Sequence, residues 1–197
     1  MVRRQQISAA AGDLILKYGS EHVTVRRIAK EIGVSEGAIY RHFRSKREVL
    51  AFLVDDTEKA LRSDIENNRS EGKDALENLK EIIVHVEARK GISFQVIAEI
   101  ISFGDKRLNE KVRKAVNNYV GLIRDVLSEG VMAGIIKRDV NLDAAATMYY
   151  GMVEGLVNIW TLSHYDFSLV ENFASLWDMY RRIVQAAPAS AETPQQR

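Results

Sequence analysis

Apolar residues recur every three or four positions along almost the whole chain, which is the period of an amphipathic α-helix and not of a strand. The first apolar stripe covers residues 3–18 and ends at Gly19, a residue suited to the left-handed cap of a helix. Further stripes predict helices over residues 24–32, 35–43, 45–67, 73–89, 92–103, 106–133, 142–163 and 168–186. The pattern predicts an all-α protein of about nine helices.

Polar residues mark the starts of several of these helices. Thr24 and Ser35 precede the second and third helices as N-cap residues, whose side-chain oxygens accept from free backbone N–H groups. The sequences Ser-Lys-Arg-Glu (45–48) and Ser-Leu-Val-Glu (168–171) have the spacing of a capping box. The polar run at 68–72 predicts a loop.

The segment from Thr24 to Phe43 has the spacing of a helix-turn-helix. Ala29 is small enough for two short helices to cross, and Gly33 tolerates the positive φ that the turn needs. A miniature core is predicted from Leu14, Ile28, Ile32, Val34, Ile39 and Phe43. The residues left facing outward are Ser35, Glu36, Gly37, Ala38, Tyr40, Arg41 and His42.

The first turn of the third helix is poorly chosen for stability, because glycine costs roughly 1 kcal/mol relative to alanine inside a helix. Gly37 and Ala38 make sense there if the surface must approach base edges in a DNA groove closely. The alternative is a helical hairpin whose basic face is incidental.

The run from Thr24 to Leu50 resembles the tetracycline-repressor (TetR/AcrR) family of bacterial transcription regulators. The likeness lies in Gly-Val-Ser (33–35), Ala-Ile-Tyr-Arg-His-Phe (38–43) and Ser-Lys-Arg-Glu-Val-Leu (45–50). It is close over the first fifty residues, and beyond them it rests on helix number and length. The resemblance implies a sequence-specific DNA-binding regulator: a repressor released from a pseudo-palindromic operator by a small apolar or amphipathic effector.

The resemblance also implies roles for residues of the helix-turn-helix. Thr24, the Val25 amide and Arg26 would hold one phosphate at a helix N-terminus. The base edges would meet Glu36, Gly37, Ala38 and Arg41, with Arg41 reading guanine. Glu36 departs from the family, many of whose members carry lysine there. The full set of predicted DNA contacts adds Ser35 and the phosphate-binding Tyr40, His42 and Lys46.

One short recognition helix reads few base pairs, so a second copy of the chain is expected about 34 Å away on the DNA. The two last long helices are predicted to form this homodimer, because Gly151-x-x-x-Gly155 allows close helix approach and large apolar residues surround it. The predicted interface residues are Gly151, Gly155, Trp160, Phe173, Trp177 and Tyr180. Alternatively, the aromatic residues complete the core of a single chain.

The resemblance implies an apolar effector pocket in the body, and the helix over 92–103 suits it because that helix is short, apolar and adjacent to the helix leading from the head. Polar residues on apolar stripes, with neighbouring aromatic residues, are the candidates to line it. They are His85, Phe94, Glu99, Phe103, Asn118, Tyr119, Glu154 and Asn158. For each one, a surface residue or a satisfied core group is the alternative.

Charge is divided unevenly along the chain. Residues 1–50 hold ten lysines and arginines against five acidic residues, whereas the remainder holds 18 against 22. A basic head on an acidic body favours a polyanionic partner. There is no cysteine, which excludes disulfides and thiolate metal sites. No apolar run reaches the roughly 18 residues of a membrane span, and no secretory signal is evident, so a cytoplasmic protein is expected.

The expected organisation is a DNA-binding domain at 1–47, a ligand-binding and dimerisation domain at 48–187, and a disordered tail at 188–197. A small helical enzyme is the main alternative, but the four histidines are scattered and no glycine-rich phosphate loop is present, so no catalytic residue, cofactor or metal is expected. A helical adaptor without DNA binding is a third reading. The pattern from Thr24 to Lys46 is unbroken and argues against it.

Overall fold

The computed structural model describes residues 4–70, 72–102 and 104–187, which form nine α-helices and one 3₁₀-helix. The prediction of an all-α fold is confirmed. The α-helices are α1 (Arg4–Tyr18), α2 (Val25–Glu31), α3 (Glu36–Tyr40), α4 (Lys46–Ser70), α5 (Ala75–Ala88), α6 (Ile92–Ser102), α7 (Lys106–Met132), α8 (Leu142–Leu162) and α9 (Leu169–Val184). The 3₁₀-helix η1 (Ser20–His22) was not predicted.

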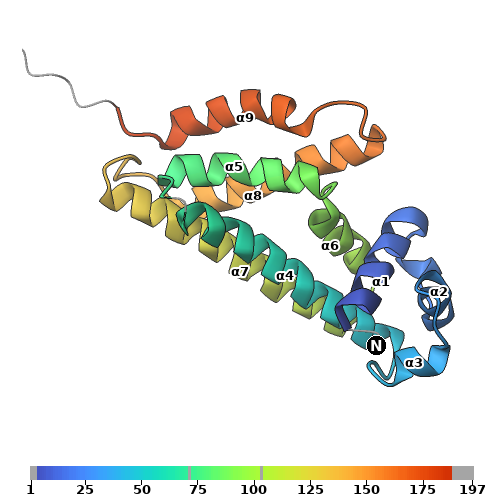
Figure 1. Cartoon of the computed structure of the whole chain (residues 1–197). Coiled ribbons are helices and arrows are strands. Elements are labelled where there is room, and N and C mark those ends of the chain that lie inside the picture. Colours follow the sequence, from blue (N-terminus) through green and yellow to red (C-terminus); the bar gives the residue numbers. More distant parts are fainter. Residues whose placement is uncertain (1–3, 71, 103, 188–197) are drawn as a thin grey trace, which may run out of the picture.

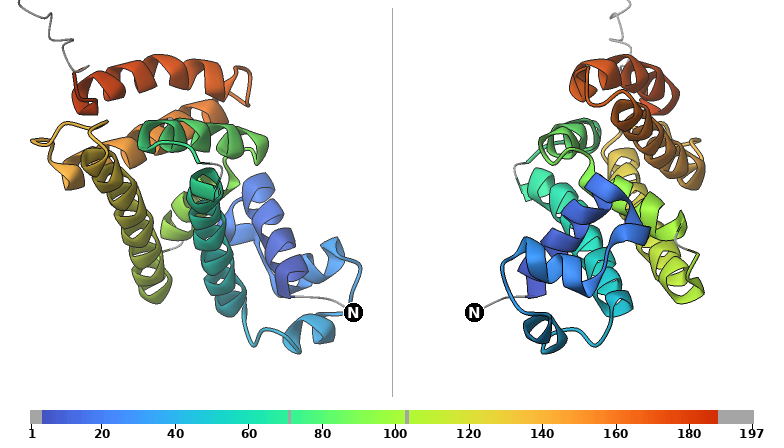
Figure 2. Two further views of the ribbon diagram at one scale, coloured as in Figure 1. Left: turned by 60° about the vertical axis from the view of Figure 1, so that its left-hand side comes forward. Right: turned by 90° about the vertical axis from the view of Figure 1, so that its right-hand side faces the viewer.

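The helices form a small head and a larger body (Figure 1). The head contains α1, α2 and α3. The long helices α4 and α7 lie side by side, and α4 leads from the head into the body. Helices α5, α8 and α9 lie at the opposite end, and α6 stands between them and α1 (Figures 1 and 2).

The local signals of the helix-turn-helix are confirmed. The Thr24 hydroxyl accepts from the Arg27 N–H at 3.1 Å, and the Ser35 hydroxyl accepts from the Ala38 N–H at 3.3 Å. Gly33 has a φ of +69°, as the turn requires. Ile39 is fully buried and fixes α3 on the head, so the opposite side of α3 faces solvent.

The capping box predicted at 45–48 forms differently from its sequence pattern. The Ser45 hydroxyl accepts from the Glu48 N–H at 3.3 Å, as expected. The Glu48 carboxylate, however, accepts from the N–H of Arg44 at 2.7 Å and not from that of Ser45. The side chain is long enough to reach one residue further back, so spacing alone does not fix its partner.

The cap predicted at 168–171 is completed from another helix. Ser168 accepts from the Glu171 N–H at 3.2 Å, but the Leu169 N–H donates to the carboxylate of Glu87 on α5, at 2.7 Å. A complete capping box stands at Asp74 and Glu77, at the start of α5. The helix pattern alone did not single it out.

The loop predicted at 68–72 begins later than expected, because α4 continues to Ser70. Asn68 is buried and its side-chain amide donates to the carbonyl of Asn78, at 3.0 Å. The Asn78 amide donates in turn to the carbonyl of Ile65, at 3.2 Å. These asparagines therefore join α4 to α5 inside the protein. The tail predicted at 188–197 lies outside the described residues.

The core of the body contains the aromatic residues that were predicted to face a partner chain. Trp160, Phe173, Trp177 and Tyr180 are each at most 5% exposed in the single chain. Tyr149 lies among the last three, with ring centroids 5.8 to 6.5 Å from theirs. The prediction that these four side chains form the dimer surface is therefore replaced by the alternative that they complete the core.

Candidate DNA-binding head and effector site

Helix α3 presents its predicted outward residues to solvent. Tyr40 is 52% exposed, and Ser35, Glu36, Gly37 and Arg41 are exposed as well. Ala38 and His42 are half-buried at the edges of the same surface. A Cβ added at Gly37 would approach only the hydroxyl of Ser35, at 3.9 Å. The glycine is therefore not required by packing within the chain.

The start of α2 lies in the same head. Thr24 and Arg26 are exposed, whereas Val25 is buried and contributes only its backbone to the surface. The first N–H groups of a helix have no partner within the helix, so this turn offers donors to an anion. Contact of these three residues with a phosphate stays a prediction.

Two arginines that the sequence pattern did not single out extend the basic surface beside α3. Arg4 and Arg44, with Arg41 and His42, line an open hollow of about 550 Å³, whose lining also includes the carboxylates of Glu48 and Asp55. The Arg4 guanidinium lies over the rings of Phe43 and Phe52, 4.5 and 4.7 Å from their centroids. Both arginines lie outside the helix-turn-helix motif, at its margins, which is why the motif did not reveal them.

Lys46 has an additional role within the head. Its ammonium donates to the carbonyl of Ser20 in η1, at 2.7 Å, and burial lowers the pKa of the side chain. Lys46 therefore holds η1 to the start of α4, and its predicted phosphate contact remains a prediction.

The head is fastened to the body at two places. The Ser20 N–H donates to the carboxylate of Glu99 on α6, and the Ser20 hydroxyl donates to the Glu99 carbonyl, both at 3.1 Å. Arg47 on α4 pairs with Asp105 at 2.5 Å, and Asp105 also caps α7. The hydrogen bond from the Leu108 N–H, followed by the Arg47 contact, keeps the pKa of Asp105 below its usual value. These contacts join α6 and the start of α7 to the head.

The structure does not bring the eight predicted pocket residues together. Glu99 belongs to the junction with the head, Asn118 is exposed and donates to Glu58 at 2.9 Å, and Asn158 is exposed. His85 and Glu154 are half-buried on α5 and α8, and Phe103 lies outside the described residues. Three of them share a neighbour: the ring of Tyr150 lies 5.9 and 6.2 Å from those of Phe94 and Tyr119, and Glu154 accepts a hydrogen bond from Tyr150.

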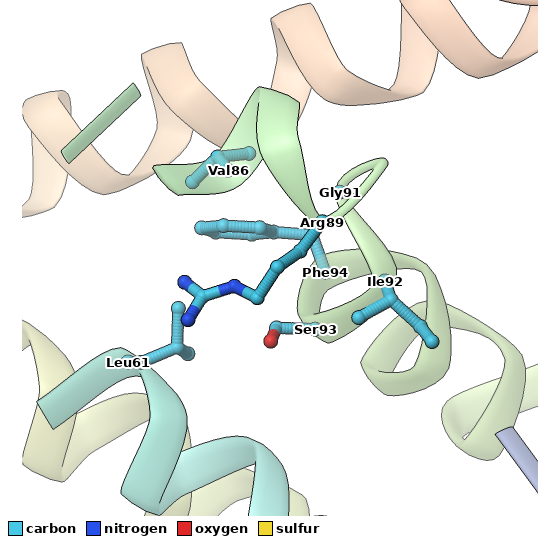
Figure 3. Close-up of a pocket in the computed structure, with 7 residues that line it drawn as sticks. All are labelled: Leu61, Val86, Arg89, Gly91, Ile92, Ser93 and Phe94. Atoms are coloured by element: carbon cyan, nitrogen blue, oxygen red, sulfur yellow. The ribbon is translucent and has the colours of Figure 1, made fainter. Parts of the chain in front are cut away.

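A closed seam, missed by the sequence analysis, lies where α4, α5 and α6 meet (Figure 3). It leaves no room for a water molecule. The side chain of Arg89 crosses it and pairs with the carboxylate of Asp64 on α4. The seam residues are Leu61, Val86, Arg89, Gly91, Ile92, Ser93 and Phe94.

Glu154 predicts a pH dependence of stability. Burial raises the pKa of its carboxyl, and a hydrogen bond from Tyr150 opposes this in part. The folded state therefore keeps this proton to a higher pH than the unfolded state, so its contribution lowers stability as pH rises from the ordinary carboxyl range through the raised pKa. Between pH 4.5 and 7, we expect the urea concentration at the unfolding midpoint to fall less in Glu154→Gln than in the wild type, at fixed protein concentration. An equal loss in both proteins contradicts this, and Glu31→Gln, at an exposed site, is the control.

An exposed apolar face runs along α8 and α9. Gly151 and Gly155 lie on it, and a Cβ added at either would meet no atom within 4 Å in the single chain. The sequence analysis predicted these two glycines but missed the large apolar residues beside them. Those residues, with exposed fractions from 39% to 80%, are Met148, Ile159, Leu162, Met179 and Ile183.

No helix within residues 4–187, leaving aside 71 and 103, combines the length and apolar character needed to cross a membrane. In the same part of the chain, no three histidine, aspartate or glutamate side chains are grouped so as to hold a metal ion.

The sequence matches known families and proteins over nearly its whole length. It fits the family model for bacterial regulatory proteins of the tetR family over residues 7–52, and that for the C-terminal region of YsiA-like proteins over residues 48–185. The nucleoid occlusion factor SlmA of Vibrio atlanticus is 29% identical over 180 residues, which cover 89% of this chain and 92% of that protein. The fatty acid metabolism regulator protein of Bacillus subtilis is 26% identical over 168 residues, covering 84% and 87%.

Solved structures agree with this assignment. The transcriptional regulator FadR from Bacillus subtilis, in complex with stearoyl-CoA, superposes with a TM-score of 0.79 at 25% identity, covering 90% of this chain and 97% of that one. The fatty acid degradation regulator FadR from Bacillus halodurans gives a TM-score of 0.81 at 23% identity, covering 91% and 98%. The chain belongs to the TetR family of bacterial regulatory proteins and is a DNA-binding transcription regulator.

Proposed function

We propose that the protein is a homodimeric repressor that leaves a pseudo-palindromic operator when a small amphipathic effector binds its body. The observation that carries this proposal is the exposed surface of α3, which is fixed on the fully buried Ile39 and has in its first turn a glycine that packing within the chain does not require. Such a surface suits close approach to base edges.

Base edges and phosphates are assigned to different residues of the head. Arg41 would read guanine in the major groove, and Glu36 would accept from a cytosine amine. Phosphate contacts position a protein without selecting sequence. We assign them to the start of α2, to Tyr40, His42 and Lys46, and to Arg4 and Arg44 in the adjoining hollow.

The homodimer would form through the exposed apolar face of α8 and α9. Gly151 and Gly155 allow the backbones to approach, and Ile159 and Leu162 provide apolar area that a single chain leaves in water. Pairing places two recognition helices on one duplex, about one helical turn apart.

The effector would enter the body at the seam between α4, α5 and α6. This position is supported by its place beside the head: α4 begins in the head, and α6 holds Ser20 through Glu99. A molecule that separates α6 from α4 would move both attachments. The relatives concerned with fatty acids, one of them holding stearoyl-CoA, favour an effector with an aliphatic chain.

We assign the head to residues 1–47 and the body to residues 48–187, with α4 crossing the boundary as one helix. A regulator of this kind acts on chromosomal DNA, and we propose the cytoplasm as its location.

Selection of bound DNA from a random pool, at a stated salt near 150 mM, tests the function. We expect a palindromic consensus with half-sites about ten base pairs apart, centre to centre. Arg41→Ala should lose roughly tenfold or more of the preference at one base position per half-site. Gly37→Leu should fold normally and lose specific binding, because its side chain would occupy the space next to the bases.

Gly121→Leu is the matched control, since Gly121 lies within α7 and a Cβ there meets no atom within 4 Å. It should bind the selected sequence like the wild type. Enrichment of no sequence by the wild type would refute the proposed function, and unchanged specificity in Arg41→Ala and Gly37→Leu would refute the assignment of α3.

A further inference from the structure

Arg89 lies at the corner between α5 and α6 and is the charged group of the seam. It caps the end of α5, and Lys90 and Gly91 follow it with φ angles of +52° and +62°. Its side chain is 36% exposed, so part of the Arg89 side chain contacts solvent at the edge of the seam. The apolar side chains of Leu61, Val86 and Phe94 line the seam around it (Figure 3).

The partner of this guanidinium is enclosed by protein. The side chain of Asp64 on α4 is only 5% exposed and is paired with Arg89. A carboxylate buried this deeply depends on its cation, because removal of one partner leaves an uncompensated charge in the interior. Arg89, the more exposed partner, is therefore accessible to an incoming anion. Asp64, the buried partner, would be left as an unpaired charge if it lost Arg89.

A second unused polar group lies nearby. The Tyr119 hydroxyl is buried without a hydrogen-bond partner among the described residues, beside the ring of Tyr150, which also contacts Phe94. Desolvation, followed by the negative charge of Asp64, raises the pKa of Tyr119, so the hydroxyl stays protonated. A buried donor without a partner is unfavourable and is satisfied when an acceptor arrives.

We propose that Arg89 recognises the anionic group of the effector and that Asp64 is the internal anion that this group displaces. The effector is then an anionic amphipath: an aliphatic chain that enters the seam between Leu61, Val86 and Phe94, with a carboxylate or phosphate held at the mouth by Arg89. The inference rests on the proposed function, since it names the effector class of that site.

Displacement of Asp64 from Arg89 by the anionic group of the effector would link effector binding to the position of the head. Once Arg89 turns to the ligand, the Asp64 carboxylate is left unpaired in the interior, close to a second negative charge. It regains solvation if α4 shifts away from the α5–α6 corner. Since α4 also carries Lys46 and Arg47, which hold η1 and Asp105, that shift displaces the head.

Release of the selected operator by the full-length protein tests this inference. The probes are palmitate, palmitoyl-CoA, neutral 1-hexadecanol, and coenzyme A without a chain. Operator release is followed by fluorescence anisotropy, and direct binding of each probe by calorimetry. We expect palmitate, palmitoyl-CoA or both to act at concentrations at least about tenfold below hexadecanol. Coenzyme A alone should not act.

The variants separate charge recognition from folding. Asp64→Asn removes the competing anion and should bind the anionic probe about tenfold more tightly. Arg89→Gln should lose the preference for anions, but it leaves Asp64 unpaired and its fold is at risk. The double variant Asp64→Asn/Arg89→Gln has no charge in the seam and should fold and bind hexadecanol and the anionic probes alike.

Lys111→Gln is the matched control, because Lys111 on α7 pairs with Asp55 on α4, at 2.5 Å, outside the seam. It should keep the wild-type preference. The inference is overturned if the double variant still prefers the anionic probes. It is also overturned if the wild type binds none of the aliphatic probes or prefers hexadecanol. If the wild type selects no DNA, the proposed function fails, and calorimetry still decides the role of Arg89.

Discussion

Replacement of Ile159 and Leu162 together by aspartate is expected to convert the protein into a helical monomer. In the single chain these side chains are 57% and 80% exposed, so the substitutions disturb little packing within the fold. In a dimer built on the α8–α9 face they would place unpaired charges in an apolar interface, twice by symmetry. We expect the dissociation constant of the dimer to rise at least about a thousandfold, equivalent to roughly 4 kcal/mol.

Analytical ultracentrifugation measures the change in association, and far-UV circular dichroism checks that the helices remain. Affinity for the palindrome should fall at least about a hundredfold, because the two half-sites no longer bind as one unit. Met132→Asp is the control: Met132 is 78% exposed at the end of α7 and belongs to neither α8 nor α9. A double variant that still sediments as a dimer would place the interface elsewhere.

Gly91→Ala is expected to lower the free energy of unfolding by about 3 kcal/mol. Gly91 has a φ of +62°, which costs an L-residue roughly 1–2 kcal/mol. An added Cβ would also lie 2.6 Å from Cγ1 of Val157, a buried residue of α8, and such overpacking costs about 1–3 kcal/mol. Urea denaturation at fixed protein concentration measures the loss.

Gly134→Ala separates these two causes. Gly134 has a φ of +74°, but a Cβ there would meet no atom within 4 Å. The control should therefore lose only the contribution of the backbone, about 1–2 kcal/mol. If Gly91→Ala and Gly134→Ala lower the free energy of unfolding by the same amount, the contact with Val157 does not constrain the α5–α6 corner.

The head was predictable from the sequence because its signals are local. Thr24, Ser35 and Gly33 each act on backbone groups within a few residues, through caps and a turn that the chemistry of the residue dictates. Ile39 has the helical spacing expected for a residue of the predicted miniature core. Hence the exposed face of α3 could be named from residue spacing alone.

The effector site could not be found in this way, because its partners are chosen by tertiary packing. Asp64 and Arg89 are 25 residues apart, and nothing in either helix pattern indicates that they pair. Glu99 has the pattern of a pocket residue, but a contact 79 residues away assigns it to the junction with the head. Hydrophobic periodicity reports that a side chain is buried and not what it is buried against.

The exposed apolar residues of the proposed dimer face could not be predicted from the sequence, for a different reason. Helix α8 is apolar on more than one side, so its sequence does not distinguish the side that packs on its own chain from the side left exposed. The aromatic residues drew attention because they are large, yet Trp160 and Trp177 lie inside the chain. Ile159 and Leu162, less conspicuous in the sequence, remain on the surface.

The unbroken length of α4 has a mechanical consequence. From Asp64 back to Lys46 the helix spans about 27 Å at 1.5 Å per residue, and no proline or glycine interrupts it. A tilt of roughly 5° about the Asp64 end would move the Lys46 end of this helix by about 2.4 Å. Applied in opposite senses in two copies, it would change the separation of the recognition helices by about 5 Å, more than the 3.4 Å step between base pairs. A rigid helix of this length lets a small effector move the two DNA-binding heads out of register with the half-sites of their operator.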